Sequence, residues 1–426
     1  MENSKTETTR VSQLAENIIG SEIIKLAAEV KSLIEKGQKI YNFTIGDFNP
    51  EQFPIPKGFE EEIIKAYRQN QTNYPPANGI LELRNAVSKL LKTRGKINYS
   101  PEEIVVMGGA RPIIYSVYSA IVDPGDTVVY TVPSWNNNHY SYLHRAKSYV
   151  VEGHPKNNFM PSAEDIRPAI ADASLIALCS PQNPTGTVFT KEGLEEICDL
   201  ILEENKKRRD ERKPVYLLFD QIYWELTMNG VEHHNPVVLR PEMKKYTLFI
   251  DGLSKSLSST GVRVGWGFGP KEVMDKVKSI NSHIGAWAPK AEQTAFANFL
   301  NDGNKYIDFI DGQRSRIYNR LKGLYDGIQT LKSEGFSVDA ISPQAAIYLT
   351  IKFDLKGRIT PEGKTIETTE DITSYILNEG KLAVVPFYAF GTSRDSTWYR
   401  LSVGTCSMED IPVVISNLRE AMGKLS

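Results

Sequence analysis

The sequence predicts an α/β protein with a mostly parallel sheet, followed by a smaller α+β unit. Between about residues 102 and 269, short runs rich in β-branched residues alternate with longer amphipathic runs. Most of the short runs are apolar throughout, which is typical of strands whose two faces are both covered by helices. Beyond about residue 290, long helical stretches replace this alternation. The 426 residues allow two or three domains of roughly 150 residues each.

The predicted elements of the first part follow one another as strand and helix. Strands are expected at residues 104–107, 127–132, 175–178, 215–219, 246–250 and 262–266. Helices are expected at 111–122, before the turn Asp123-Pro-Gly-Asp126, and at 191–207. Successive strand–helix units of this kind build a parallel sheet.

Beyond about residue 290, the sequence predicts long helices and a few strands. A long helix is expected at 306–333, strands at 346–352, 382–385 and 397–403, and a closing helix at 409–422. A surface loop is expected at 356–371. The helix predicted at 21–36 and the segment 41–49 have no place in the large sheet, so they are expected to join this second part. We therefore predict a large domain over 55–310 and a small domain formed by 1–54 with 311–426.

The charge balance argues against polyanionic partners. Fifty basic and 52 acidic residues give a formal charge of −2, so no long-range field attracts nucleic acid or anionic lipid. The one dense charge run, at 203–214, mixes both signs and ends at a proline, which is typical of the solvated end of a helix; the alternative is a basic patch for RNA. We expect neither nucleic-acid nor membrane binding.

Cysteine usage and the N-terminal residues indicate a cytoplasmic protein. The three cysteines are widely separated and lack the spacing of a disulfide framework or a zinc site, so no metal is expected. The first ten residues contain no apolar run, and no stretch approaches the roughly 18 apolar residues of a membrane span.

Lys255 is the strongest catalytic candidate. It lies in a Ser/Thr-rich stretch, and Arg263 follows eight residues later. A lysine amine can form a Schiff base with an aldehyde cofactor, and a nearby guanidinium can hold a phosphate of the same molecule. The alternative is a surface lysine beside a turn.

Two polar side chains follow the predicted strand at 215–219. Asp220 comes after four apolar residues, where a carboxylate is costly unless a cation accompanies it. A pyridinium nitrogen is such a cation, and Tyr223 can bond a phenolic oxygen on the same ring. The alternative for Asp220 is a helix N-cap.

Three further segments lie where predicted strands end, which is where open α/β sheets bind ligands. Asn183 opens the loop Asn183-Pro-Thr-Gly186, which is also a common turn. Gly108 and Gly109 precede a predicted helix, where backbone amides attract a phosphate, although a plain turn explains them as well. Trp135 can stack on a flat ring or pack in the core.

Together and in this order, these segments resemble the class I and II aminotransferases of the fold type I pyridoxal-phosphate (PLP) enzymes. The similarity runs from about residue 41 to the C-terminus and rests on residues 41–50, 74–84, 109–110, 183–186, 220–223 and 399–402, with Trp135, Ser254, Lys255 and Arg263. The resemblance implies a large domain with a seven-stranded, mostly parallel sheet and a smaller α+β domain.

The resemblance also implies roles for residues around the cofactor ring. Lys255 is then the Schiff-base lysine and the acid/base of the proton shift. Asp220 pairs with the pyridine nitrogen. Asn183 and Tyr223 hold the phenolic oxygen of the ring, and Trp135 stacks on it.

Further implied roles concern the phosphate and the substrate. The implied phosphate ligands are Gly109, Ala110, Ser254, Arg263 and, from the neighbouring subunit of a homodimer, Tyr74. Arg400 is implied to bind the substrate α-carboxylate as a bidentate pair, assisted by Gly46 and Asn183.

The chain departs from the usual family pattern at several positions. A serine that often lies three residues before the lysine is replaced by Gly252, and whether Ser254 compensates is open. Asp220 is followed by Gln221 rather than Glu, and Asp47 is followed by Phe48, which affects the substrate pocket. Ala110 and Arg111 replace a more typical polar pair, so phosphate contacts there are expected mostly from backbone amides. No second arginine for a distal substrate carboxylate is evident.

The predicted function is a PLP-dependent aminotransferase of amino-acid metabolism, which exchanges an amino group between an L-amino acid and a 2-oxo acid by a ping-pong route. The alternative is a PLP-dependent β-lyase or an aminocyclopropane-carboxylate-synthase-like enzyme on the same scaffold. A PLP-dependent transcription regulator is disfavoured because only about 40 residues precede the family segment, too few for a DNA-binding domain. A nicotinamide dehydrogenase is disfavoured because no GxGxxG follows an early strand.

Overall fold

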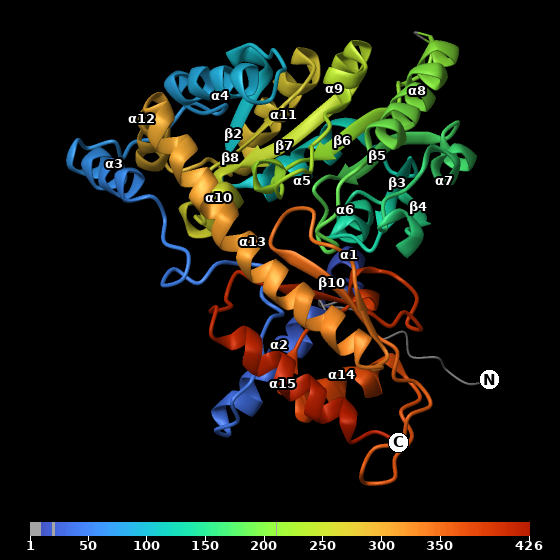
Figure 1. Cartoon of the computed structure of the whole chain (residues 1–426). Helices are drawn as coiled ribbons and strands as arrows, with labels where there is room; N and C mark the ends of the chain where they lie inside the picture. The colour runs from blue at the N-terminus through green and yellow to red at the C-terminus, as the bar shows by residue number, and fades with distance from the viewer. Residues whose placement is uncertain (1–9, 19–21, 210) are drawn as a thin grey trace.

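The computed structural model, which describes residues 10–18, 22–209 and 211–426, is built around a seven-stranded sheet (Figure 1). The strand order is β2 (Ile104–Met107), β8 (Gly265–Phe268), β7 (Thr247–Gly252), β6 (Tyr216–Asp220), β5 (Ala173–Cys179), β3 (Thr127–Val132) and β4 (Lys147–Glu152). Strand β8 pairs antiparallel with both neighbours, and the other pairings are parallel. The predicted mostly parallel sheet is confirmed.

Both faces of this sheet are buried, as the continuously apolar strands predict. In β6, Leu217 and Phe219 pack into one hydrophobic core, and Leu218 packs into the other. In β2, Val106 faces the first core and Val105 the second. Because side chains alternate along a strand, an unbroken apolar run supplies both cores at once.

Helices cover each face through their apolar sides. The core on one face receives side chains from α4 (Leu81–Thr93), α8 (Lys191–Arg208) and α12 (Lys290–Asn301). The core on the other face receives side chains from α5 (Ala110–Ile121) and α11 (Lys271–Ile284). The remaining helices of this part are α3 (Lys57–Arg68), α6 (Asn137–Leu143), α7 (Ala163–Ile166), α9 (Pro236–Leu239) and α10 (Leu253–Ser256).

Two strand predictions in the large sheet need correction. Strand β4 was not predicted from the sequence. It lies at the edge of the sheet, where most of its side chains are partly or fully exposed, so its sequence lacks the apolar run of the inner strands. The strand predicted at 262–266 begins only at Gly265, because residues 260–262 form a 3₁₀ turn and Arg263 has a left-handed backbone with φ of 61°. This turn directs Arg263 to the Gly108 carbonyl, which accepts a hydrogen bond from Nη2 at 2.9 Å.

A second sheet, antiparallel and four-stranded, lies below the large one in Figure 1. Its order is β12 (Val385–Pro386), β13 (Trp398–Ser402), β10 (Tyr348–Phe353) and β9 (Val338–Ala340). The N-terminal strand β1 (Tyr41–Asn42) pairs with β11 (Leu382–Ala383), and the amide of Asn49 donates to the Gly404 carbonyl at 2.8 Å. The segment 41–49 therefore joins the C-terminal part of the chain, as expected.

Helices complete this second part. Helix α13 (Gly303–Ser333) runs from the large sheet to the small one and packs with α14 (Thr369–Asn378) and α15 (Asp410–Gly423) around a separate core. Helices α1 (Gln13–Glu16) and α2 (Glu22–Glu35) precede β1; the predicted start of α2 at residue 21 lies outside the described residues. The domain boundaries given above stay predictions.

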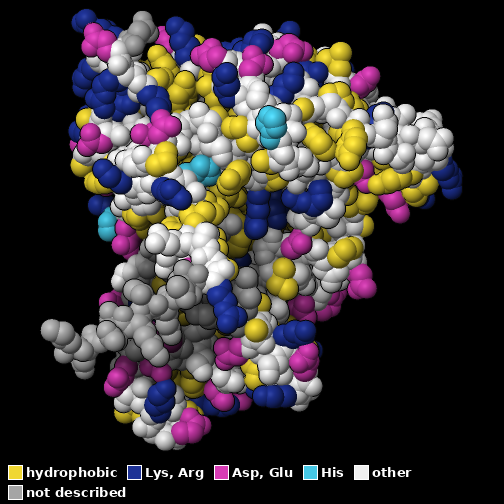
Figure 2. Space-filling view, turned by 180° about the vertical axis from the view of Figure 1, so that it is seen from behind, with side chains coloured by type: hydrophobic (Ala, Val, Ile, Leu, Met, Phe, Trp, Pro, Cys, Tyr) yellow, Lys and Arg dark blue, Asp and Glu magenta, His cyan; other side chains and the backbone are white. Residues whose placement is uncertain are grey.

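The outer surface mixes both signs of charge. In Figure 2, acidic and basic side chains lie among one another over most of the face shown, in keeping with the net charge of −2. Within the described ranges, no helix is long and apolar enough to cross a membrane.

A buried ion pair ties three elements together and generates a stability prediction. Glu225, which is 5% exposed, accepts from Arg94 Nε at 2.7 Å and from the Tyr306 hydroxyl. Arg94→Met leaves this carboxylate buried without its cation, so we expect a loss of about 3 kcal/mol in unfolding free energy, measured by urea denaturation.

The matched control for this prediction is Arg167→Met. It breaks an exposed pair with Glu164 of similar length, 2.8 Å, and we expect no measurable loss. Equal losses in the two variants would contradict the importance of burial.

Candidate active site

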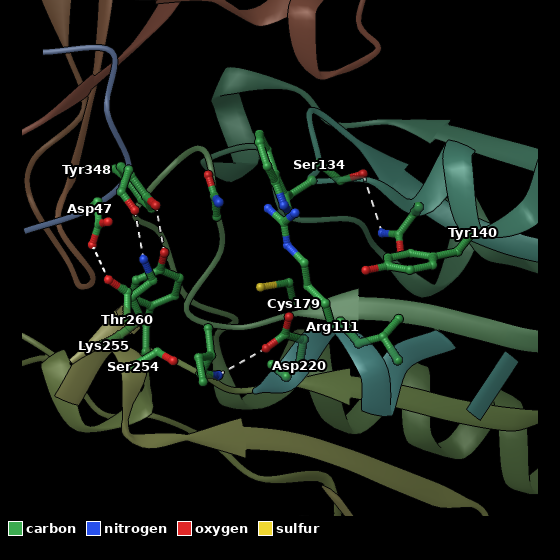
Figure 3. Close-up of a pocket in the computed structure, with 18 of the residues that line it drawn as sticks. Asp47, Arg111, Ser134, Tyr140, Cys179, Asp220, Ser254, Lys255, Thr260 and Tyr348 are labelled. Atoms are coloured by element: carbon green, nitrogen blue, oxygen red, sulfur yellow. Dashed lines mark hydrogen bonds between the residues drawn. The ribbon is translucent and has the colours of Figure 1, made fainter. Parts of the chain in front are cut away.

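A cavity of about 510 Å³ lies where the carboxyl ends of the parallel strands face the small sheet (Figure 3). Asp220 ends β6, Asn183 follows β5, and Trp135 follows β3. Arg400 reaches the same cavity from β13 of the small sheet. The cavity therefore collects residues that are far apart in the sequence, and both sheets contribute to its wall.

Lys255 lies in the short helix α10 directly after β7, and its Nζ donates to the Gly46 carbonyl at 2.7 Å. Burial lowers the pKa of Lys255 to about 8, because a protonated amine is poorly solvated there. Three guanidinium groups act in the same direction, those of Arg400, Arg111 and Arg263, and Asp47 acts against them. The structure thus holds a lysine amine that is partly unprotonated close to neutral pH.

Asp220 has no cationic partner among the described residues. Its carboxylate accepts the backbone N–H of Ile222 at 3.1 Å, and desolvation raises the pKa of Asp220 to about 6. A carboxylate in this position favours a cationic ligand group such as a protonated ring nitrogen, which would restore its negative charge.

The turn that leads into α5 forms a candidate anion-binding site with Arg263. We call this site, made of Gly109, Ala110 and Arg263, the anion cradle. Gly109 has φ of 99°, and a Cβ there would collide with the Arg263 guanidinium. A Cβ on Gly265 would lie 2.6 Å from the Gly109 carbonyl carbon and 2.8 Å from the Ala110 nitrogen. Glycine at both positions lets Arg263 and the amides at the start of α5 approach one anion.

The departure at Gly252 has a steric reason. A Cβ at this position would lie 2.9 Å from Gly265 Cα and 3.1 Å from the Val264 carbonyl oxygen, so a serine does not fit without a shift. Ser254, which lines the cavity, is the hydroxyl that remains beside Lys255.

Arg400 is almost completely buried and is oriented by two neighbours. Its Nη1 donates to the Asn183 side-chain oxygen at 3.0 Å, and its Nη2 donates to the Thr44 carbonyl at 2.6 Å. Its Nε is buried and has no hydrogen-bond partner among the described residues. A buried guanidinium with a free donor is suited to a ligand carboxylate.

Tyr223 is buried, and its hydroxyl lies 2.6 Å from the hydroxyl of Tyr348, a residue of β10. Tyr348 was not predicted as a site residue, because an aromatic residue in a predicted strand is typical of a core. The Arg400 Cζ lies 4.8 Å from the centre of the Tyr348 ring.

Arg111 is a second residue whose role in the cavity was missed. Its side chain extends from the start of α5 into the pocket, and its Cζ lies 5.4 Å from the Trp135 ring centre (Figure 3). No hydrogen bond or ion pair to its guanidinium is formed within the described part of the chain. The only available signal was its position directly after the Gly109-Ala110 turn.

Tyr74 does not join the other site residues within one chain. It is 81% exposed, and its ring packs edge-on against Trp287 with 5.1 Å between the ring centres. It lies outside the lining of the main cavity. The other residues that were given a cofactor or substrate role from the sequence all line this cavity except Gly109, which belongs to the anion cradle.

The residues present fit PLP. The cavity offers an amine, a carboxylate without a cation, an indole and an anion cradle, which match the aldehyde, ring nitrogen, ring face and phosphate of that cofactor.

Comparisons with known proteins agree with this chemistry. A model of the family described as aminotransferase class I and II matches residues 38–418. An aspartate aminotransferase of Bacillus sp. strain YM-2 is 29% identical over 372 residues, which cover 86% of this chain and 88% of that protein. A probable aspartate/prephenate aminotransferase of Rickettsia conorii is 30% identical over 393 residues, 91% of this chain and 92% of that protein.

Solved structures give the same result. The aspartate aminotransferase of Rhizobium meliloti superposes with a TM-score of 0.89 at 25% identity, covering 98% of this chain and all of that chain. The Thermus thermophilus aspartate aminotransferase with maleate gives a TM-score of 0.84 at 27% identity, covering 97% of this chain and all of that one.

The burial of Lys255 predicts its titration. Competitive acylation with a limiting reagent, quantified by mass spectrometry in the protein without added cofactor, should show the reactivity of Lys255 rising through about pH 8. Lys271 is the control, because its bond to Asp275 holds its pKa above the ordinary value. If Lys255 titrates together with Lys271, the amine is not desolvated as described.

Proposed function

This chain belongs to the class I and II aminotransferase family, and we propose that it accepts acidic L-amino acids as amino donors. It is a PLP-dependent transaminase, which moves an amino group between an L-amino acid and a 2-oxo acid. The observation that carries the assignment of its residues is the partly unprotonated Lys255 amine, which shares one cavity with Asp220 and Arg400.

Lys255 is proposed as the residue that moves the proton. When bound, PLP supplies a ring that withdraws electrons from the substrate Cα. With PLP bound, the Lys255 Nζ would accept the proton from the substrate Cα and later give it back. A pKa of about 8 suits this role, since an amine can both accept and give a proton when its pKa lies near the working pH.

Other residues orient the reacting groups. Asp220 would pair with the protonated ring nitrogen of PLP, and Trp135 would stack on the ring. Arg400 binds the α-carboxylate through its free Nε, while Asn183 fixes the plane of the guanidinium. Gly109, Ala110, Ser254 and Arg263 hold the phosphate, and Gly46 assists at the carboxylate. These roles account for the Arg400 Nε without a hydrogen-bond partner and for the Asp220 carboxylate without a cation, both among the described residues.

Arg111 supports an acidic donor. Arg400 binds the α-carboxylate that every amino acid has, whereas Arg111 offers a second guanidinium in the same cavity. The Arg111 guanidinium lies over the Trp135 ring and has no hydrogen-bond or ion-pair partner among the described residues. The related proteins include aspartate aminotransferases, and the Thermus thermophilus enzyme was solved with maleate, which is a dicarboxylate. The alternative reaction, a β-lyase or an aminocyclopropane-carboxylate synthase, finds no support in these relatives.

The complete site is proposed to need a homodimer. Tyr74 is exposed beside Trp287 and away from its own cavity, which leaves its hydroxyl free to reach the phosphate site of a second copy. We also place the enzyme in the cytoplasm, because its three free cysteines suit a reducing compartment.

Arg111→Gln tests the substrate class. Removal of a charge-assisted bond to a distal carboxylate should lower kcat/KM for aspartate and glutamate about tenfold or more, with little change for alanine or phenylalanine. Steady-state assays with 2-oxo acid acceptors measure this ratio. An equal loss for all donors, accompanied by weaker PLP binding, would assign Arg111 to the phosphate instead.

A mixture of one inactive variant and one impaired variant tests the dimer. Lys255→Ala should abolish turnover while still binding PLP without a covalent link, and Tyr74→Ala should weaken the partner's site. In a hybrid dimer, the chain that keeps Lys255 receives an intact Tyr74 from the other chain, so one full site is restored.

Activity measured after the two variants are unfolded and refolded together should therefore exceed the sum of the separately refolded variants. If Tyr74 served its own chain, every site in the mixture would lack one of the two residues, and the activity would not exceed that sum. Turnover by Lys255→Ala alone would refute the catalytic assignment.

A further inference from the structure

The hydroxyl pair formed by Tyr223 and Tyr348 joins the two sheets inside the cavity. Tyr223 follows β6 of the large sheet, and Tyr348 belongs to β10 of the small sheet. Their oxygen atoms lie 2.6 Å apart, and both side chains are buried. The hydrogen bond is therefore shielded from water, where it is stronger than at a surface.

Proton counting fixes the direction of this bond once the cofactor is present. A tyrosine hydroxyl has one proton to donate. If Tyr223 gives its proton to the phenolic oxygen of the ring, only Tyr348 can supply the proton between the two hydroxyls. Tyr348 then donates to Tyr223, and Tyr223 donates to the ring.

The surroundings of Tyr348 favour this direction. The Arg400 guanidinium lies over its ring at 4.8 Å and can only donate hydrogen bonds. A Cβ on Gly46 would lie 2.8 Å from the Tyr348 hydroxyl, so the backbone packs closely there. No other hydrogen bond to this hydroxyl is formed within the described part of the chain.

We propose that Tyr348 is a positioning residue that strengthens the hydrogen bond from Tyr223 to the cofactor, and that it thereby lowers the pH at which the bound cofactor loses its imine proton. This inference rests on the proposed role of Lys255 and on a role for Tyr223 at the phenolic oxygen of the ring, which the family resemblance implies. When the proton leaves, the negative charge of the phenolic oxygen loses its neighbour, so a strong donor stabilises the deprotonated form more.

Other titratable and charged groups also face the two hydroxyls, and they are the same in the natural enzyme and in a variant that lacks only the Tyr348 hydroxyl. The Tyr223 ring has Lys255 Nζ at 5.9 Å from its centre. Arg400, Cys179 and Asp47 act on one or both hydroxyls from β13, β5 and the segment after β1. Removal of the Tyr348 hydroxyl alone therefore measures the effect of the two successive hydrogen bonds from Tyr348 to Tyr223 and from Tyr223 to the ring. We call these two bonds the relay.

The test is a pH titration of the visible absorption of the PLP-loaded enzyme. In Tyr348→Phe we expect the midpoint to rise by about 0.5 pH unit, the size of one lost cooperative hydrogen bond. Tyr223→Phe should raise it further. The double variant Tyr223→Phe/Tyr348→Phe should match Tyr223→Phe alone, because the relay acts only through the Tyr223 hydroxyl.

The matched control is Tyr399→Phe. It removes another buried hydroxyl from the small sheet, but one that bonds the Thr369 carbonyl at 3.2 Å, so the midpoint should not move. A general loosening of the small sheet would shift both variants. Retained PLP absorption in each variant shows that it has folded.

An unchanged midpoint in Tyr348→Phe overturns the proposal, as does a shift that persists fully in the Tyr223→Phe background. These failures differ from failure of the proposed site. If the natural enzyme itself carries no PLP linked to Lys255, the site assignment is wrong, whereas a normal titration with an unshifted Tyr348→Phe refutes the relay alone.

Discussion

The constraint on which the site depends is the burial of the Lys255 amine among three guanidinium groups. Burial is the largest cause that disfavours the protonated amine and lowers its pKa; Arg400, Arg111 and Arg263 act in the same direction, and Asp47 opposes them. A cavity with several cations and few acidic partners attracts anions. The phosphate and carboxylate groups of PLP and substrate are such anions, so the electrostatics that activate the lysine also attract the ligands that it serves.

This cluster requires the two sheets to meet. Arg263 is held beside the Gly109 turn by the large sheet, whereas Arg400 comes from the small sheet and is oriented by the Asn183 side chain of the large one. The hydroxyl contact between Tyr223 and Tyr348 crosses the same boundary. A shift between the sheets would therefore change substrate binding and cofactor chemistry together.

Several residues show how far the sequence could predict the site. Asp220, Asn183 and Trp135 each follow a recognisable strand, and carboxyl ends of parallel strands share one edge, so their meeting was predictable. Arg111 was visible only as a departure from a motif, and its direction depends on the side-chain packing at the start of α5. Tyr348 gave no signal, because an inward-facing tyrosine in a strand looks like any core residue.

The sequence by itself determined the alternating strands and helices, the apolar runs that cover both faces of the large sheet, and the order of the motifs around Lys255. These are local properties, set by side-chain periodicity and by turn residues. The tertiary structure alone decided which cations surround the amine, which hydroxyl bonds Tyr223, and why residue 252 must lack a side chain next to Gly265. Such contacts join residues that are distant along the chain, and their energies depend on burial and separation, which exist only after the sheets have packed together.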